Sequence, residues 1–228
     1  IFEIISSFPL IKETGDHVNY LDPKVSLRVN PSNMKGYKNE NRQINNDNLF
    51  NINRLGLIDT LESGQNLTLG LDYKKERVDN INRYFELKLG TVLRSKENNN
   101  IPTNSTLNKK YSNYFGQITN NLNENIKLNY EFSINHDLDE IQYNSLGTSF
   151  TKNNFITTFN YIEEDGEIGS TNILENITTF NFDNKNYFTF RTRENREIDL
   201  TEYYDLIYEY KNDCLVAGIK YNKTYYQD

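Results

Sequence analysis

The chain has 228 residues, with 36% hydrophobic residues, 25% charged residues and a formal net charge of −7. Nucleic acid is excluded as a partner because phosphate binding requires a basic face. No stretch reaches the ~20 apolar residues of a membrane helix. The 17 Tyr and 13 Phe favour strands. Composition therefore leaves two readings: the wall of a membrane barrel, whose polar lumen lowers the average hydropathy, and a soluble, Tyr-rich β-sandwich.

The N-terminal region reads as two strands followed by a loop. Residues 1–10 are apolar enough for a strand that ends in Phe8-Pro9, and a Gly-Asp turn follows. Residues 18–30 form the second predicted strand, and the Asn-rich residues 33–48 form a loop. Ile1 opens the chain without the basic segment and cleavage site of a signal peptide, so we expect a piece of a longer protein.

The stretch from Asn48 to Tyr73 changes character halfway along. In its second half, apolar residues at 67, 69, 71 and 73 alternate with polar or small ones, which predicts a strand. Its first half, Asn48 to Asp59, has no periodicity. We expect the segment from Asn39 to Asp59 to fold inward, inside a lumen or at its mouth, before the strand begins.

The rest of the chain repeats a strand-and-turn pattern. Strands are predicted at 63–76, 82–94, 114–121, 125–135, 141–151, 154–163, 176–182, 187–193, 200–210 and 214–225, with a long polar loop at 95–110. About twelve strands at ~10-residue spacing, joined alternately by short and long connections, are typical of a membrane barrel. The predicted fold is all-β: a partial, antiparallel, up-and-down (meander) transmembrane β-barrel.

Alternation also predicts which side chains share a face. Residues 126–135 give the cleanest period of two, so we expect Ile126, Leu128, Tyr130 and Phe132 to face lipid. The polar residues expected to face the lumen alternate with apolar neighbours and are Lys127, Glu131, Arg191, Arg193, Glu209 and Lys220.

No catalytic or metal-binding pattern stands out. His17 and His136 are far apart in the sequence, and one Cys is too few for a zinc cluster. A phosphate-binding glycine loop and a nucleophile elbow are both missing. We therefore expect a protein that is not an enzyme and has no cofactor.

The block Asn48-Leu49-Phe50, Asn53-Arg54, Gly56 and Asp59 precedes an alternating strand and follows Lys38-Asn39-Glu40-Asn41. This arrangement resembles the barrel domain of the LptD family, the lipopolysaccharide-assembly proteins of the outer membrane. The Phe8-Pro9 strand and the Tyr-rich segment 206–215 are also similar to the family. The chain departs from it at Cys214, because many members have two adjacent Cys and then Trp.

The resemblance implies that residues 1–228 are the C-terminal part of one barrel in the outer membrane of a Gram-negative bacterium, with the periplasmic domain and first strands missing. Such a barrel passes lipopolysaccharide through its lumen and a lateral gate into the outer leaflet. The implied partners are lipopolysaccharide, an LptE-like plug lipoprotein, outer-membrane lipid and a periplasmic bridge protein that reaches the missing N-terminal domain. The alternatives are a passive porin and a soluble β-sandwich adhesin or binding module.

The resemblance also suggests roles for individual residues. Cys214 would form a disulfide with the missing domain, unless it is a small buried hydrophobe. The expected substrate-path residues are Asn53, Arg54, Asp59, Arg191 and Arg193, and the expected lateral-gate strand carries Leu215, Ala217, Ile219 and Tyr221.

Overall fold

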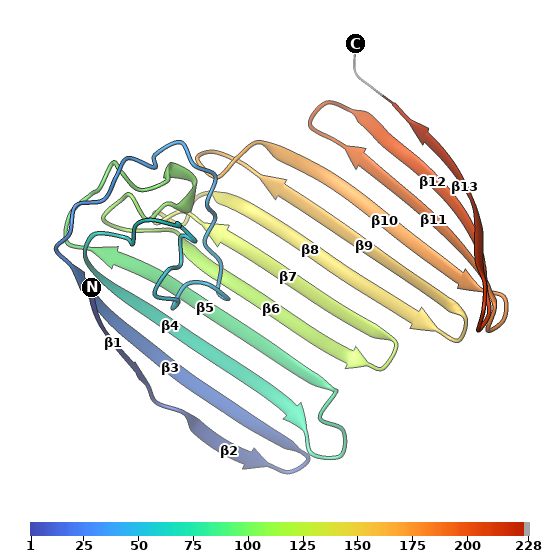
Figure 1. Cartoon of the computed structure of the whole chain (residues 1–228). Helices are drawn as coiled ribbons and strands as arrows, with labels where there is room; N and C mark the ends of the chain where they lie inside the picture. Colours follow the sequence, from blue (N-terminus) through green and yellow to red (C-terminus); the bar gives the residue numbers. More distant parts are fainter. Residues whose placement is uncertain (226–228) are drawn as a thin grey trace.

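The computed structural model describes residues 1–225, which form a single antiparallel sheet of 13 strands with short and long connections (Figure 1). The strands are β1 (Phe2–Ser7), β2 (Leu10–Thr14), β3 (His17–Asn30), β4 (Gly64–Arg77), β5 (Tyr84–Arg94), β6 (Tyr114–Asn123), β7 (Ile126–Ile134), β8 (Ile141–Lys152), β9 (Phe155–Glu164), β10 (Thr171–Asn181), β11 (Asn186–Asn195), β12 (Leu200–Lys211) and β13 (Val216–Thr224). A single 3-10 turn, η1, spans Thr103–Ser105 within the described part. Among residues 1–225, no helix is long and apolar enough to cross a membrane.

The strand order is that of a meander. Each strand from β3 to β13 pairs with its neighbours in the sequence, and β1 and β2 both pair with β3. The sheet is open, with β1 and β2 at one edge and β13 at the other. The predicted fold class, a partial up-and-down barrel, is therefore confirmed, whereas the alternative of two packed sheets is not what the chain forms.

The predicted first strand, residues 1–10, is divided in the structure. β1 ends at Ser7 and β2 begins at Leu10, because Pro9 has no backbone N–H to continue the ladder. The Phe8 N–H donates a hydrogen bond to the carbonyl oxygen of Pro23, 3.1 Å away. Both short strands remain antiparallel to β3, so the break changes the edge of the sheet and leaves the meander unchanged.

The two longest connections, 31–63 and 95–113, lie on the same edge of the sheet. The short-turn edge carries the turns at 15–16, 78–83, 124–125, 153–154, 182–185 and 212–215, and the long-loop edge carries the connections at 31–63, 95–113, 135–140, 165–170 and 196–199. Gly15 and Asn153 have positive φ values of 57° and 51°, which suit tight turns. Outer-membrane barrels have the same asymmetry, with short turns on the periplasmic side.

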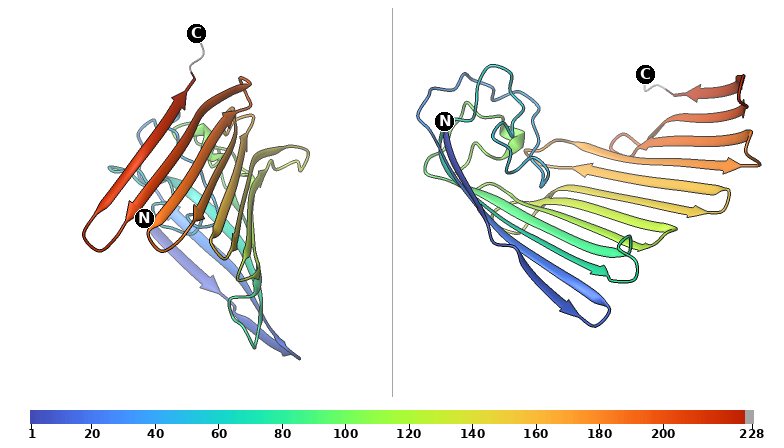
Figure 2. Two further views of the ribbon diagram at one scale, coloured as in Figure 1. Left: turned by 90° about the vertical axis from the view of Figure 1, so that its right-hand side faces the viewer. Right: turned by 60° about the horizontal axis from the view of Figure 1, so that its bottom comes forward.

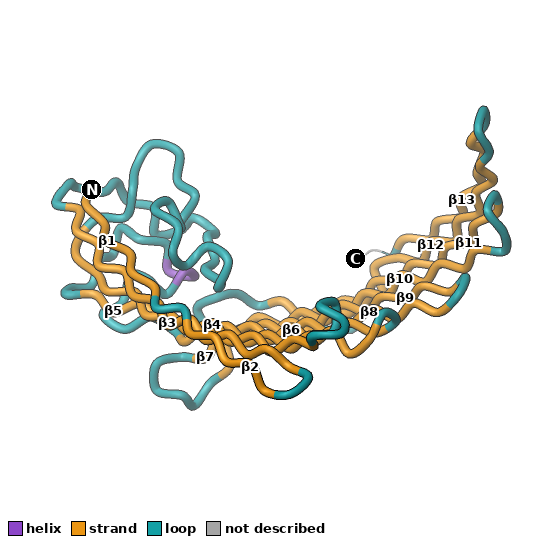
Figure 3. Tube along the Cα trace, turned by 90° about the horizontal axis from the view of Figure 1, so that it is seen from below, coloured by secondary structure: helices purple, strands orange, loops and turns teal. Residues whose placement is uncertain are grey.

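The sheet is strongly curved and has a concave inner face and a convex outer face (Figures 2 and 3). The register places Ile126, Leu128, Tyr130 and Phe132 on the outer face, as alternation predicts, and the Phe132 ring lies over Gly116. Their contact with lipid stays a prediction. The six polar residues expected in the lumen all share the inner face: Lys127, Glu131, Arg191, Arg193, Glu209 and Lys220.

Candidate functional site

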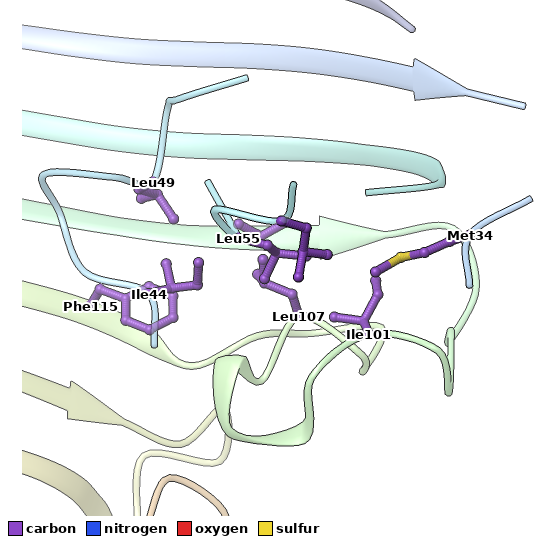
Figure 4. Packing of buried hydrophobic residues seen from close by; sticks show 9 residues of the cluster. Met34, Ile44, Leu49, Leu55, Ile101, Leu107 and Phe115 are labelled. Atoms are coloured by element: carbon purple, nitrogen blue, oxygen red, sulfur yellow. The ribbon is translucent and has the colours of Figure 1, made fainter. Parts of the chain in front are cut away.

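Two long loops fold back over the inner face instead of extending away from the sheet. We call residues 31–63 and 95–113 together the inner unit; Figure 3 shows it within the concave side, next to β1–β5. Its apolar side chains form a buried cluster with two strand residues (Figure 4). The members are Met34, Ile44, Leu49, Leu55, Leu57, Ile101 and Leu107 from the loops, with Val92 and Phe115 from β5 and β6. The core thus lies between the loops and the sheet.

The segment from Asn39 to Asp59 contains no strand, as its irregular sequence predicts. Leu49, which is 1% exposed, packs with Phe50 against two glycines that face each other across β4 and β5. A Cβ atom at Gly70 would lie 2.6 Å from the Phe50 ring, and one at Gly90 would lie 2.2 Å from Leu49 Cδ2. The two glycines therefore form a socket for Phe50 and Leu49, and a larger residue at either position would fill it.

A buried ion cluster holds the other end of this loop. Arg28, Asn66 and Arg94 lie side by side across β3, β4 and β5, and the Glu62 carboxylate sits against them. The Arg54 guanidinium donates two hydrogen bonds to that carboxylate, from Nε at 2.6 Å and from Nη2 at 2.8 Å. Asn66 Nδ2 donates a further one at 3.0 Å.

The three arginines also bind the surrounding backbone and strands. Arg28 Nη2 donates to Glu3 Oε1 on β1 and to the carbonyl oxygen of Asn51, each at 2.8 Å. Arg54 Nη1 donates to Thr68 Oγ1 on β4 at 3.0 Å. The cluster therefore joins the loop to four strands, β1, β3, β4 and β5.

Electrostatics keeps Glu62 ionised despite its burial. Burial raises the pKa of this carboxyl, but the guanidiniums of Arg54, Arg94 and Arg28 outweigh that effect, so the pKa of Glu62 lies below its usual value. Removing one partner from such a cluster leaves an uncompensated buried charge, at a cost of about 3–5 kcal/mol. The ion cluster therefore anchors the loop to the sheet.

Two of the three substrate-path residues expected in this loop, Asn53 and Asp59, line the same pocket, whereas Arg54 does not. Arg54 is 3% exposed and wholly engaged in the ion cluster. Asn53 is exposed, and its side chain caps the next turn through the backbone N–H and carbonyl oxygen of Leu57. Asp59 is also exposed, 2.8 Å from Lys35 Nζ. Only Asn53 and Asp59 are therefore accessible to a passing ligand, and the role of all three stays a prediction.

The inner unit also contacts strands farther along the sheet. Gln43 Nε2 donates to Glu164 Oε1 on β9 at 2.6 Å, and Asn113 Nδ2 donates to Ser133 Oγ on β7 at 2.9 Å. The Lys109 ammonium forms an ion pair with Glu167 in the β9–β10 loop. In residues 1–225, no hydrogen bond or ion pair joins the inner unit to β10–β13, and Figure 3 shows these strands at the other end of the sheet; we call their inner face uncovered.

Arg191 and Arg193 lie on this uncovered face, on β11, far along the sheet from Arg54. Arg193 Nε is 2.7 Å from Glu202 Oε2, and the Tyr203 hydroxyl donates to Glu175 Oε1 at 2.9 Å. Arg191 lies directly opposite Asp205 in the register and is exposed. Within the described residues, its guanidinium has no hydrogen-bond or ion-pair partner.

The gate and disulfide residues lie at the C-terminal edge of the sheet. Cys214 has a free, exposed thiol in the β12–β13 turn, on the short-turn edge, and its role stays a prediction. The backbone N–H groups of Cys214 and Leu215 both donate to Asn212 Oδ1. Leu215 therefore belongs to the turn, whereas Ala217, Ile219 and Tyr221 share the outer face of β13.

Sequence reasoning missed the partners of Arg54. Glu62 looks like an ordinary polar residue before a strand, and Arg28 and Arg94 look like lumen-facing charges. A weak signal existed: both arginines alternate with apolar residues at strand ends that adjoin the two longest loops. The glycines at 70 and 90 also sit at polar-face positions, where small residues permit close backbone approach.

Among residues 1–225, no group of three or more His, Cys, Asp or Glu side chains could hold a metal ion.

A curved meander with a polar inner face, an apolar outer face, long loops at one edge and short turns at the other defines the wall of a membrane β-barrel. The family model described as LPS transport system D matches residues 1–188. The chain belongs to the LptD family. Comparison with curated proteins gives no match.

Proposed function

We propose that this chain is part of the barrel that moves lipopolysaccharide across the outer membrane and into its outer leaflet. The family is one of lipopolysaccharide transport and assembly in Gram-negative outer membranes. The observation that carries the proposal is the pairing of a polar, partly uncovered inner face with an apolar outer face on one curved sheet. Sugars suit the inner face and acyl chains suit the outer face.

The finer mechanism follows from the same arrangement. The saccharide moves along the lumen, on the side lined by Arg191 and Arg193, while the lipid leaves sideways through a seam in the wall. The edge of β13 has unpaired backbone groups in this sheet and must pair with a further strand. A seam there would be the lateral gate, with Ala217, Ile219 and Tyr221 facing lipid.

We also propose that residues 1–228 belong to one barrel domain, completed by strands outside this chain. An LptE-like plug lipoprotein would occupy part of the lumen, and a periplasmic bridge protein would deliver substrate through an N-terminal domain. Cys214 would form a disulfide with that domain, and its exposed thiol on the short-turn edge supports this. None of these roles requires catalysis.

The experiment is depletion of the full-length protein in its own bacterium, with surface lipopolysaccharide measured by labelling intact cells. Depletion should lower newly delivered surface lipopolysaccharide, and re-expression should restore it. Unchanged delivery after depletion would contradict the proposal. Purified protein in liposomes provides a second comparison, because a passive porin would conduct small ions and leave lipopolysaccharide delivery unaffected.

A further inference from the structure

The inner unit divides the inner face into a covered and an uncovered part. Its contacts reach β3 to β9, through the ion cluster, the glycine socket and the bonds from Asn113 and Gln43. Beyond β9 the inner face carries mostly polar side chains, with Ile173, Ile177 and Ile207 among them. A ligand inside this barrel would therefore meet the loops on one side and the inner face of β10–β13 on the other.

We propose that the inner unit is a fixed partition, and that the saccharide of lipopolysaccharide travels along the inner face of β10–β13 without displacing it. This inference rests on the proposed function and adds to it the route within the barrel. A movable lid would be held by exposed contacts that exchange readily with water. The inner unit is held instead by a buried hydrophobic cluster and by a buried, multiply bonded carboxylate.

The inner face of β10–β13 carries charges of both signs, which suits a polar saccharide. Tyr203 presents a phenol ring on this face, and polar groups suit sugar hydroxyls. Asp205 pairs with Lys220 at 3.1 Å and Arg193 pairs with Glu202, whereas the exposed Glu209 has no ion-pair partner among residues 1–225. Arg191 is exposed and has no such partner among residues 1–225. Its guanidinium can therefore bind a phosphate or carboxylate group of the passing saccharide.

The covered part offers a matched comparison for a test. Tyr143 on β8 and Tyr203 on β12 both occupy inner-face positions. Tyr143 lies under the inner unit, beside Ile44 and Phe115. Tyr203 lies on the uncovered face, where its hydroxyl bonds Glu175. A saccharide confined to β10–β13 can reach Tyr203, but it can reach Tyr143 only if the inner unit moves away.

The experiment replaces each tyrosine in turn by a photo-crosslinking phenylalanine analogue in the full-length protein, in cells that actively export lipopolysaccharide. We expect lipopolysaccharide adducts at 203 and none at 143. In the Tyr203 variant, adding Arg191→Ala should lower adduct yield about two- to fivefold, the range for an exposed charge pair. Adducts at 143 and none at 203 would overturn the inference, and so would equal adducts at both positions.

A locked variant tests whether the partition is fixed. Because a Cβ at position 90 would lie 2.2 Å from Leu49 Cδ2, Leu49→Cys and Gly90→Cys are within reach of a disulfide, whose Cβ atoms are about 3.5–4.5 Å apart. We expect oxidised, locked protein to keep its adducts at 203 and its export. A block of export that reduction relieves would overturn the inference.

Hydrogen exchange in the unmodified protein tests the same point without substitutions. The amides of Leu49, Asn51 and Gly56 are hydrogen-bonded within the loop and should exchange slowly, with or without added lipopolysaccharide. Rapid exchange on adding lipopolysaccharide would overturn the partition. Loss of the proposed function is a separate outcome, since depletion would then leave surface lipopolysaccharide unchanged.

Discussion

Arg54 and Glu62, eight residues apart in one irregular loop, form a fully buried, two-bonded ion pair against the inner face of a curved sheet. The pair fixes the direction in which the loop folds. Glu62 lies two residues before β4, and Arg28 and Arg94 on the flanking strands also pair with its carboxylate, so the cluster holds the loop inside the concave side. The loop is thereby fixed against the inner face of the sheet.

The first prediction concerns this pair. Arg54→Ala should lower the free energy of unfolding by about 3–5 kcal/mol, because it leaves Glu62 buried with fewer partners. Urea unfolding of the detergent-solubilised protein measures the change. The matched control is Lys35→Ala, which removes an exposed partner of Asp59 and should have a much smaller effect. An equal decrease in the free energy of unfolding in the two variants would show that the ion cluster does not anchor the loop.

The second prediction is a dependence on pH. The pKa of Glu62 is lowered in the folded protein, so its stabilising contribution is complete above the usual pKa of 4.5. That contribution is lost as the pH falls through the lowered value. We expect protease cleavage within residues 31–63 to increase below about pH 4.5. Glu62→Gln should be cleaved readily at neutral pH already, and a Glu62→Gln loop as resistant as the wild-type loop at that pH would refute the assignment.

The third prediction concerns the glycine socket. Gly90→Ala places a methyl group against Leu49, and such overpacking costs about 1–3 kcal/mol. Gly147→Ala is the matched control, because the nearest atom to a Cβ at position 147 is 3.4 Å away. Urea unfolding should separate the two variants. If both glycines accept alanine equally well, Leu49 is not anchored in the socket.

The fourth prediction concerns Cys214. Its exposed thiol on the short-turn edge should form a disulfide with the domain outside this chain, in an oxidising compartment. Full-length protein should then migrate faster on a non-reducing gel than after reduction, and Cys214→Ser should abolish the difference. A thiol that alkylates freely in mature protein would argue against the bridge.

Much of the fold could be predicted from the sequence, because alternation and turn residues are local signals. The strand at 126–134, its two faces and the inward loop after Asn48 all followed from residue spacing. Other features depend on distant residues. The ion cluster joins positions 3, 28, 54, 62 and 94, and no local pattern shows that these charges meet. β10 begins at Thr171, five residues before its predicted start, since pairing with β9 extends it through polar residues.

The central claim is that this sheet is the wall of a membrane barrel, with lipid outside and an aqueous lumen inside. Spin labels at Leu128 and Asn129, neighbours on β7 that point to opposite faces, test it most directly in the full-length protein in lipid. We expect a lipid-soluble relaxant to reach position 128 and a water-soluble relaxant to reach position 129. Aqueous access at 128, or lipid contact at 129, would contradict the account.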